Sequence, residues 1–129
     1  MSEAEKAEKT ETIMYFATCG GENPEKACLP FVLANAALAM DITAKVVLQG
    51  NGVYLSQSGY RKNMLKGGGF PDINKLFEDF LSYGGELHVC MPCIKERNID
   101  ESELPEGAKI TAAAQVNIAA IEADAVFIY

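Results

Sequence analysis

The sequence contains no tryptophan and only one histidine, His88, and its acidic residues outnumber its basic ones. Eleven Lys and Arg against 18 Asp and Glu give a net charge of −7. Such a chain lacks the clustered cations that neutralise the phosphates of nucleic acids or that bind anionic lipid. One histidine also excludes the paired-histidine metal motifs and, at this placement, a Ser-His-Asp triad. We therefore expect no nucleic-acid partner and no membrane partner.

Long hydrophobic runs are missing as well. The longest uncharged apolar stretch, residues 27–40, contains Pro30 and Asn35 and is too short to span a bilayer. Residues 1–12 carry four Glu and two Lys and have no apolar stretch of the kind found in a signal peptide. We expect a soluble, cytoplasmic protein in which a flexible charged tail, residues 1–12, precedes a single domain, residues 13–129.

Apolar runs typical of buried strands alternate with segments of helical spacing. Strands are predicted at residues 13–18, 44–49, 86–90, 109–111 and 125–129. Helices are predicted at residues 29–40, 53–66, 72–84, 93–97 and 113–122. Alternation of this kind predicts an α/β fold, in which a parallel sheet carries helices on both of its faces.

The helix predicted at residues 29–40 is apolar on nearly every side. Such a helix is either sandwiched between other elements or used in a contact between subunits. A chain of 129 residues covers only part of such a surface by itself, so we predict a homo-oligomer.

Four cysteines are present, and without a secretory signal their thiols should be reduced. They are Cys19, Cys28, Cys90 and Cys93. Chemistry in parallel sheets gathers at the carboxyl ends of the strands. Cys19 follows the first strand and Cys90 ends the third, so a strand order of 2-1-3-4-5 would bring Cys19, Cys90 and Cys93 to one rim. The pattern itself does not fix that order.

The strongest motif is Cys90-Met91-Pro92-Cys93, which follows a strand directly and opens a helix. A helix N-terminus stabilises negative charge and so favours the reactive thiolate, and Lys95 and Arg97 add positive potential nearby. Cys28 lies in an apolar stretch and should react slowly.

Other interpretations of these cysteines remain open. Cys90 and Cys93 could be buried small hydrophobes. A thioredoxin-like motif would follow the first strand and usually a tryptophan, and neither condition holds. A zinc site would need Cys19 and Cys28 as further ligands, although their spacing is not that of a zinc finger. His88 lies on the same strand face as Cys90, and a hydrogen-bonded structural histidine is the favoured interpretation.

Two further signals are weak. The loop Gly67-Gly68-Gly69 lacks the ending of a phosphate-binding loop. Arg61, Lys62 and Lys66 form a small basic patch, which would be either a solvated face or a contact for an acidic partner.

Several stretches together resemble the DsrE/DsrF-like family, which includes TusD-like and YchN-like branches. They are residues 13–18 with the apolar helix that follows, 44–48, 52–55, 84–99 and 123–128. The resemblance covers nearly everything after the tail and is closer to the YchN-like branch.

The resemblance implies a three-layer αβα domain with a five-stranded, mostly parallel sheet, assembled as a homotrimer or homohexamer. Several family members relay sulfur as a cysteine persulfide. The sulfur-carrying cysteine of TusD-like members matches Cys90, whereas the cysteine of YchN-like members matches Cys93. The YchN-like branch has an Ala-Arg-Gly ending, in which Arg97 matches the arginine while Glu96 and Asn98 depart from the pattern.

The resulting hypothesis is a persulfide carrier or sulfurtransferase that uses no cofactor or metal, with Cys90, Cys93, Arg97 and Cys19 as its site residues. Sulfur donor or acceptor proteins would be its partners. One alternative is a non-catalytic oligomeric binding module whose cysteines are structural or bind metal. Another is a disulfide oxidoreductase that uses Cys90 and Cys93 as a redox pair.

Overall fold

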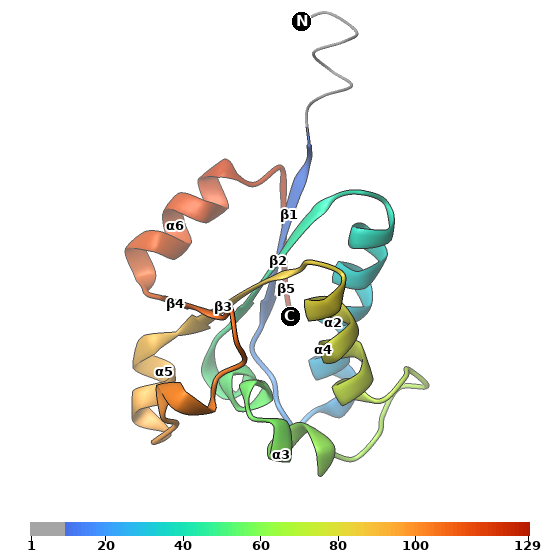
Figure 1. The fold of residues 1–129 in the computed structure, drawn as a ribbon, viewed down its shortest axis with the longest axis vertical. Coiled ribbons are helices and arrows are strands. Elements are labelled where there is room, and N and C mark those ends of the chain that lie inside the picture. Colours follow the sequence, from blue (N-terminus) through green and yellow to red (C-terminus); the bar gives the residue numbers. More distant parts are fainter. Residues whose placement is uncertain (1–9) are drawn as a thin grey trace, which may run out of the picture.

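A five-stranded, entirely parallel sheet forms the centre of the molecule (Figure 1). The computed structural model describes residues 10–129, so most of the predicted tail lies outside the described residues. The strands are β1 (Thr12–Ala17), β2 (Thr43–Leu48), β3 (Glu86–Cys90), β4 (Lys109–Thr111) and β5 (Ala125–Ile128). All five strands lie where the sequence pattern predicts them.

Helices cover both faces of this sheet, which confirms the predicted α/β class. On one face lie α2 (Pro24–Ala39) and α4 (Ile73–Ser82), and on the other lies α6 (Ala113–Glu122) (Figure 1). The connections contain the short helices α3 (Ser58–Lys62) and α5 (Met91–Glu96) and the 3₁₀ turns η1 (Gly50–Ser56) and η2 (Glu101–Glu103). The weak helix predicted at residues 53–66 is thus a 3₁₀ turn followed by a single turn of α-helix.

The strand order is β4-β3-β2-β1-β5, so the order 2-1-3-4-5 is wrong. β2 pairs with both β1 and β3 and therefore separates Cys19, after β1, from Cys90, at the end of β3. The alternation of strands and helices does not determine the order of the strands in the sheet. A right-handed crossover can place the next strand on either side of the previous one, and the local sequence pattern is the same in both cases.

The apolar helix α2 is sandwiched between the sheet and α4. It begins at Pro24, earlier than predicted, because the Asn23 side chain accepts a hydrogen bond from the Lys26 amide and caps the helix. Phe31 is fully buried, with its ring 5.3 Å from that of Phe77 and 5.6 Å from that of Phe80. Pro30 lies inside the helix and is buried too.

The predicted basic patch at residues 61–66 is wrong for Arg61, which is buried. Its guanidinium donates to the Leu55 carbonyl at 2.8 Å and to Asn74 Oδ1 at 2.9 Å, and it lies 3.9 Å from the centroid of the Phe77 ring. Burial lowers the pKa of Arg61 from its ordinary value. Arg61 therefore ties η1 to α4 and offers no charge to a partner.

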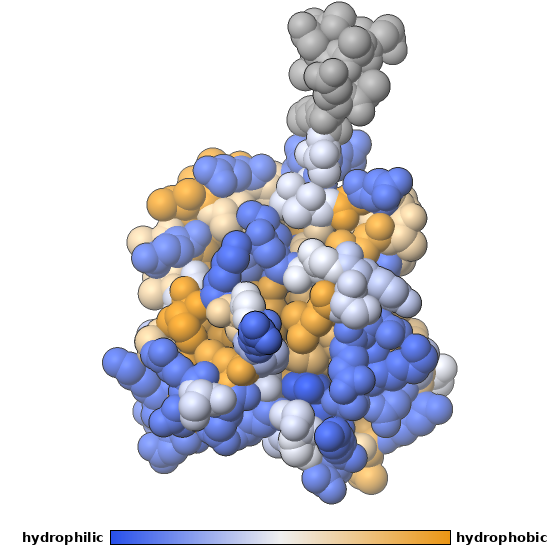
Figure 2. Space-filling view, in the orientation of Figure 1, coloured by the Kyte–Doolittle hydropathy of each residue, from blue (hydrophilic) through white to orange (hydrophobic). Residues whose placement is uncertain are grey.

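The α6 face of the sheet is only thinly covered. Its core consists of Met14, Phe16 and Val47, against which four small or medium side chains of α6 and its end pack. Apolar residues of α6 face outward, and the apolar colouring at the upper left of Figure 2 lies over this helix. In the part of the chain that the structure describes, no helix is long and apolar enough to cross a membrane.

Candidate functional site

Cys90 and Cys93 come together at the carboxyl edge of the sheet. Cys90 is the last residue of β3 and the N-cap of α5, and Cys93 lies in the first turn of that helix. Pro92 fits there because the first turn of a helix does not use its amide protons. The two Sγ atoms are 2.8 Å apart, and both side chains are half-buried. The predicted pairing of these thiols at a strand end is therefore present.

The loop after β2 supplies a hydrogen-bond donor to this pair. The Gly50 amide donates to Cys93 Sγ at 3.3 Å. Gly50 has a φ of +52°, a left-handed conformation in which glycine pays no steric penalty. At Gly52 a Cβ would lie 1.9 Å from the Ala17 carbonyl oxygen, so the loop passes directly against the end of β1. These two glycines allow the loop to take the position in which the Gly50 amide forms a hydrogen bond with Cys93 Sγ.

Arg97 is anchored beside the pair by Asn51, a residue that no pattern in the sequence singled out. Arg97 Nε and one terminal nitrogen both donate to Asn51 Oδ1, at 3.2 and 3.0 Å, and the other terminal nitrogen donates to the Cys93 carbonyl at 3.1 Å. Asn51 Nδ2 donates in turn to Glu22 Oε2 at 3.1 Å. The chain Glu22–Asn51–Arg97 joins the loop after β1, the loop after β2 and the end of α5. No motif marks Glu22 or Asn51, because their roles depend on how three separate loops meet.

Asn98 lies just past the end of α5 and has a φ of +54°. Asparagine tolerates this left-handed conformation, so Asn98 ends the helix as a glycine would.

The surroundings of Cys90 oppose ionisation of its thiol. Burial and the neighbouring Cys93 raise the pKa of Cys90 above its ordinary value, although the Cys93 backbone and the positive charge of Arg97 act in the opposite direction. The loss of solvent at this thiol is the largest of these contributions. Cys93 Sγ accepts its amide hydrogen bond from Gly50, which lies outside the helix that carries Cys93.

The other two cysteines lie apart from the pair. The Cys19 Sγ is 4.0 Å from the hydroxyl of Thr18 at the end of β1, and no hydrogen bond among residues 10–129 joins it to Cys90 or Cys93. Cys28 is buried in α2, where burial and the negative charge of Asp72 raise its thiol pKa. The slow reaction expected of Cys28 thus has a structural reason.

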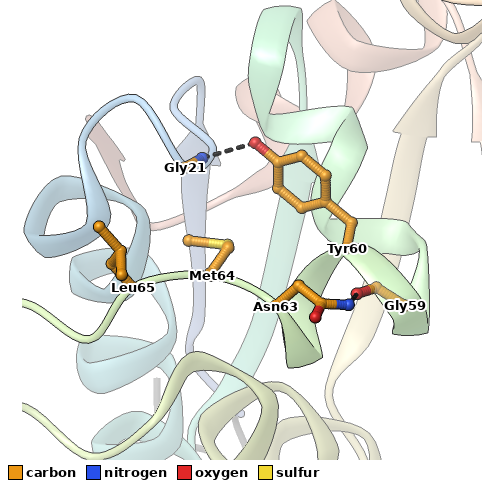
Figure 3. A pocket seen from close by; sticks show the side chains of 6 residues that line it. All are labelled: Gly21, Gly59, Tyr60, Asn63, Met64 and Leu65. Carbon is orange, nitrogen blue, oxygen red and sulfur yellow. Dashed lines mark hydrogen bonds between the residues drawn. The ribbon is translucent and has the colours of Figure 1, made fainter.

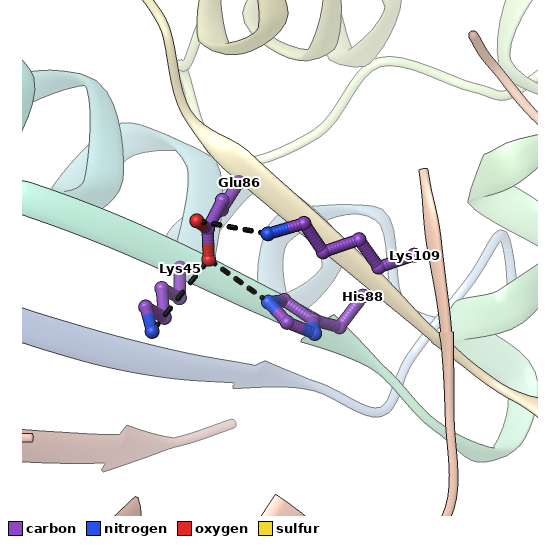
Figure 4. Close-up of polar contacts among 4 residues, drawn as sticks. All are labelled: Lys45, Glu86, His88 and Lys109. Atoms are coloured by element: carbon purple, nitrogen blue, oxygen red, sulfur yellow. Dashed lines mark hydrogen bonds and ion pairs between the residues drawn. The ribbon is translucent and has the colours of Figure 1, made fainter. Parts of the chain in front are cut away.

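His88 belongs to a polar cluster whose members lie on β2, β3 and β4 (Figure 4). Glu86 is at its centre: its carboxylate lies 3.1 Å from His88 Nε2, 3.1 Å from Lys109 Nζ and 3.6 Å from Lys45 Nζ. These contacts support the interpretation of His88 as a structural, hydrogen-bonded residue.

An open pocket of about 390 Å³ lies beyond the loop that follows Cys19 (Figure 3). The Tyr60 hydroxyl points from α3 to this loop and accepts a hydrogen bond from the Gly21 amide at 2.7 Å. The Tyr60 ring stacks on Tyr54 at 5.1 Å, and the Arg97 guanidinium lies 5.8 Å from the centroid of the Tyr54 ring. A series of contacts therefore runs from the pocket to the thiol pair: Tyr60 stacks on Tyr54, Tyr54 lies beside Arg97, and Arg97 donates to the Cys93 carbonyl.

Residues 10–129 hold no group of three or more His, Cys, Asp or Glu side chains arranged to bind a metal ion.

Comparisons with known proteins agree with this fold. The protein called Uncharacterized protein MJ0760 of Methanocaldococcus jannaschii is 32% identical over 105 residues, which are 81% of this chain and 38% of that protein. The present chain thus spans well under half the length of that relative. Uncharacterized protein MJ0989 of the same organism is 30% identical over 86 residues, which cover 67% of this chain and 71% of the relative.

Two solved structures are similar in fold. The crystal structure of the ychN protein from E. coli superposes with a TM-score of 0.76 at 18% identity, covering 93% of this chain and all of that one. The protein MTH1491 of Methanobacterium thermoautotrophicum superposes with a TM-score of 0.65 at 12% identity, covering 94% of this chain and all of that one.

A family model also matches the chain, and it extends from residue 12 to residue 129, from the start of β1 through β5. With the fold and this match in agreement, the chain belongs to the DsrE/DsrF-like family.

Proposed function

We propose that the protein is a cysteine persulfide carrier, or sulfurtransferase, in which Cys93 receives a sulfane sulfur and passes it to an acceptor. The observation that carries this proposal is the environment of Cys93. Its thiol is half-buried at the start of a helix and accepts a hydrogen bond from the Gly50 amide, and Cys90 Sγ lies 2.8 Å from Cys93 Sγ. Membership of a family linked to sulfur relay adds support.

The reaction needs only the residues of the site. The Cys93 thiolate attacks the sulfane sulfur of a donor, a new S–S bond forms, and the donor's leaving group departs with the electron pair. Arg97, held by Asn51, supplies positive charge beside the anionic persulfide. Sulfur donor and acceptor proteins are the proposed partners, and the cytoplasm is the proposed compartment because reduced thiols persist there.

Mass spectrometry after treatment with inorganic polysulfide tests this proposal. We compare Cys90→Ser, Cys93→Ser and, as a control outside the site, Cys28→Ala. We expect Cys90→Ser to gain about 32 Da, one sulfur atom, on Cys93. Cyanide should then release this sulfur as thiocyanate. Absence of the adduct in Cys90→Ser, when its circular dichroism matches the wild type, would contradict the proposal.

A second candidate function is disulfide oxidoreduction, which the 2.8 Å separation of the two Sγ atoms favours. In that case reduced protein, treated with an oxidised dithiol that carries no sulfane sulfur, would lose about 2 Da by forming a Cys90–Cys93 disulfide. A third outcome, in which neither treatment modifies the pair, would favour a non-catalytic binding module.

A further inference from the structure

Two thiols in contact constrain the fate of any persulfide formed on one of them. Cys93 Sγ becomes the inner sulfur of a Cys93 persulfide, and this is the atom that lies 2.8 Å from Cys90 Sγ. A disulfide bond is about 2.0 Å long, so only a small shift separates this contact from bonding distance. Residues three apart at a helix start also lie on one side of the helix, which permits that shift.

We propose that Cys90 resolves a persulfide on Cys93, expelling the outer sulfur as hydrogen sulfide and leaving a Cys90–Cys93 disulfide. This inference rests on the persulfide function proposed above and adds to it a sulfide-releasing activity.

The step balances within the pair. The Cys90 thiolate attacks Cys93 Sγ, a Cys90–Cys93 S–S bond forms, and the bond between the inner and outer sulfur breaks. The electron pair leaves with the outer sulfur, which takes up the proton that Cys90 lost and departs as hydrogen sulfide. The outer sulfur is reduced, Cys90 is oxidised, Cys93 Sγ keeps its oxidation level, and no external oxidant takes part. A dithiol reductant returns the pair to the reduced state.

Which sulfur Cys90 attacks decides the outcome. Attack at the outer sulfur would only move the persulfide from Cys93 to Cys90. The structure places Cys90 against the inner sulfur, which leads to sulfide instead. Cys28 is buried in α2, and Cys19 lies at the end of β1 with β2 between it and β3, so neither competes for this role.

The environment of Cys90 sets when resolution occurs. Because burial raises its pKa, Cys90 is mostly protonated near neutral pH and reacts slowly. An acceptor that arrives before Cys90 loses its proton takes the outer sulfur intact. Otherwise the sulfur leaves as sulfide. The protonation state of Cys90 thus determines how much of the bound sulfur is transferred to an acceptor and how much is released as sulfide.

A change of pH after loading tests the inference. Reduced wild-type protein and the Cys90→Ser and Cys90→Ala variants are loaded with polysulfide at about pH 6, well below the ordinary thiol pKa, and desalted without oxygen. The pH is then raised to about 10.5, about two units above the ordinary thiol pKa, so that Cys90 ionises although burial raises its pKa. Free sulfide is trapped with monobromobimane, and the masses of the Cys90 and Cys93 peptides are recorded without reduction.

We expect wild-type protein and the control Cys28→Ala to release sulfide in proportion to the persulfide they carry and to gain the Cys90–Cys93 disulfide. Both Cys90 variants should keep the adduct on Cys93 and release little sulfide. Retention of the adduct by wild-type protein at the higher pH would overturn the inference and leave the carrier function standing. Failure of both Cys90 variants to load would overturn the carrier function itself, and the inference with it.

Discussion

Arg97 brings a positive charge to the thiol pair, and its effect on Cys90 has a definite sign. A nearby cation favours a thiolate, and Arg97 accordingly lowers the pKa of Cys90 against the larger effect of burial. We expect Arg97→Met to raise this pKa further, so that alkylation of Cys90 sets in at a higher pH. The measurement is the rate of iodoacetamide labelling against pH in a Cys93→Ser background, which removes the coupling between the two thiols. Arg97→Lys, which keeps the charge, should shift the profile less, and an unchanged profile in Arg97→Met would show that the charge does not reach Cys90.

Gly52 holds the loop that carries Gly50 and Asn51 against the end of β1. A Cβ at Gly52 would meet the Ala17 carbonyl oxygen at 1.9 Å and the Ala17 carbonyl carbon at 2.7 Å, both of them backbone atoms. We expect Gly52→Ala to lower the free energy of unfolding by about 2 kcal/mol or more, measured by urea denaturation. Gly59→Ala is the matched control, because nothing lies within 4 Å of the added Cβ. It should leave stability unchanged or raise it by up to about 1 kcal/mol, since Gly59 is helical.

At the scale of elements, the contact between α2 and α4 closes the main core. Phe31 contacts both Phe77 and Phe80 and is fully buried. We expect Phe31→Ala to cost about 3–5 kcal/mol of stability, the usual range for deleting a buried aromatic ring. Leu65→Ala provides the comparison, because Leu65 is 81% exposed, and it should cost no more than about 0.5 kcal/mol. Equal costs for the two variants would mean that the α2–α4 contact is not part of the core in solution.

Glu86 links β3 to both of its neighbouring strands, and this link should be sensitive to acid. Burial raises the pKa of Glu86, but hydrogen bonds from His88 and Lys109 and the charge of Lys45 outweigh it, so the pKa lies below its ordinary value. A carboxylate with a lowered pKa in the folded state adds stability above its unfolded pKa of about 4.3. That stability is lost as pH falls through the folded-state value. We expect Glu86→Gln to be less stable than wild type near neutral pH, with the difference shrinking in acid. The exposed Glu106→Gln should follow the wild-type curve of unfolding free energy against pH, and a constant difference between Glu86→Gln and wild type would contradict the assignment.

The elements themselves could be predicted from local patterns, whereas their arrangement could not. Strand and helix periodicity locates β1 through β5 and places Cys90 and Cys93 at the junction of β3 and α5. The strand order depends on long-range packing, which no local pattern encodes, and the order considered from the sequence, in which β1 and β3 are neighbours, is not the one that forms. For the same reason the sequence identified Arg97 but missed Asn51, which reaches Arg97 from another loop. The direction of the Cys90 pKa shift likewise depends on burial, which follows from the tertiary fold.

At the scale of the whole molecule, the apolar surface that a partner could cover lies on α6 and β5. The sequence pattern pointed to the helix at residues 29–40, but α2 packs against the sheet and α4, and the large apolar residue exposed beside it is Met40, which follows its last turn. Ile118 and Ile121 of α6 and Val126 and Ile128 of β5 are exposed instead, with Ile121 84% and Ile128 74% accessible. Several large apolar side chains exposed on neighbouring elements mark a protein–protein contact more often than a surface that stays in solvent. We therefore still predict a homo-oligomer, but we expect its subunits to meet on α6 and β5.

We expect the protein to assemble as a trimer or hexamer through this α6–β5 face. Light scattering at micromolar concentration should give three or six times the chain mass of 13.9 kDa. The double variant Ile121→Glu/Ile128→Glu places two carboxylates on the face, and the cost of removing these charges from water should shift the mass to that of one chain. Leu65→Glu is the matched control: Leu65 is 81% exposed and lies on the wall of the pocket beside Tyr60, so the same substitution there should leave the mass unchanged. Circular dichroism of both variants checks that the fold is kept. Wild-type protein with the mass of a single chain would refute the assembly, and an oligomeric double variant would show that subunits meet on another face.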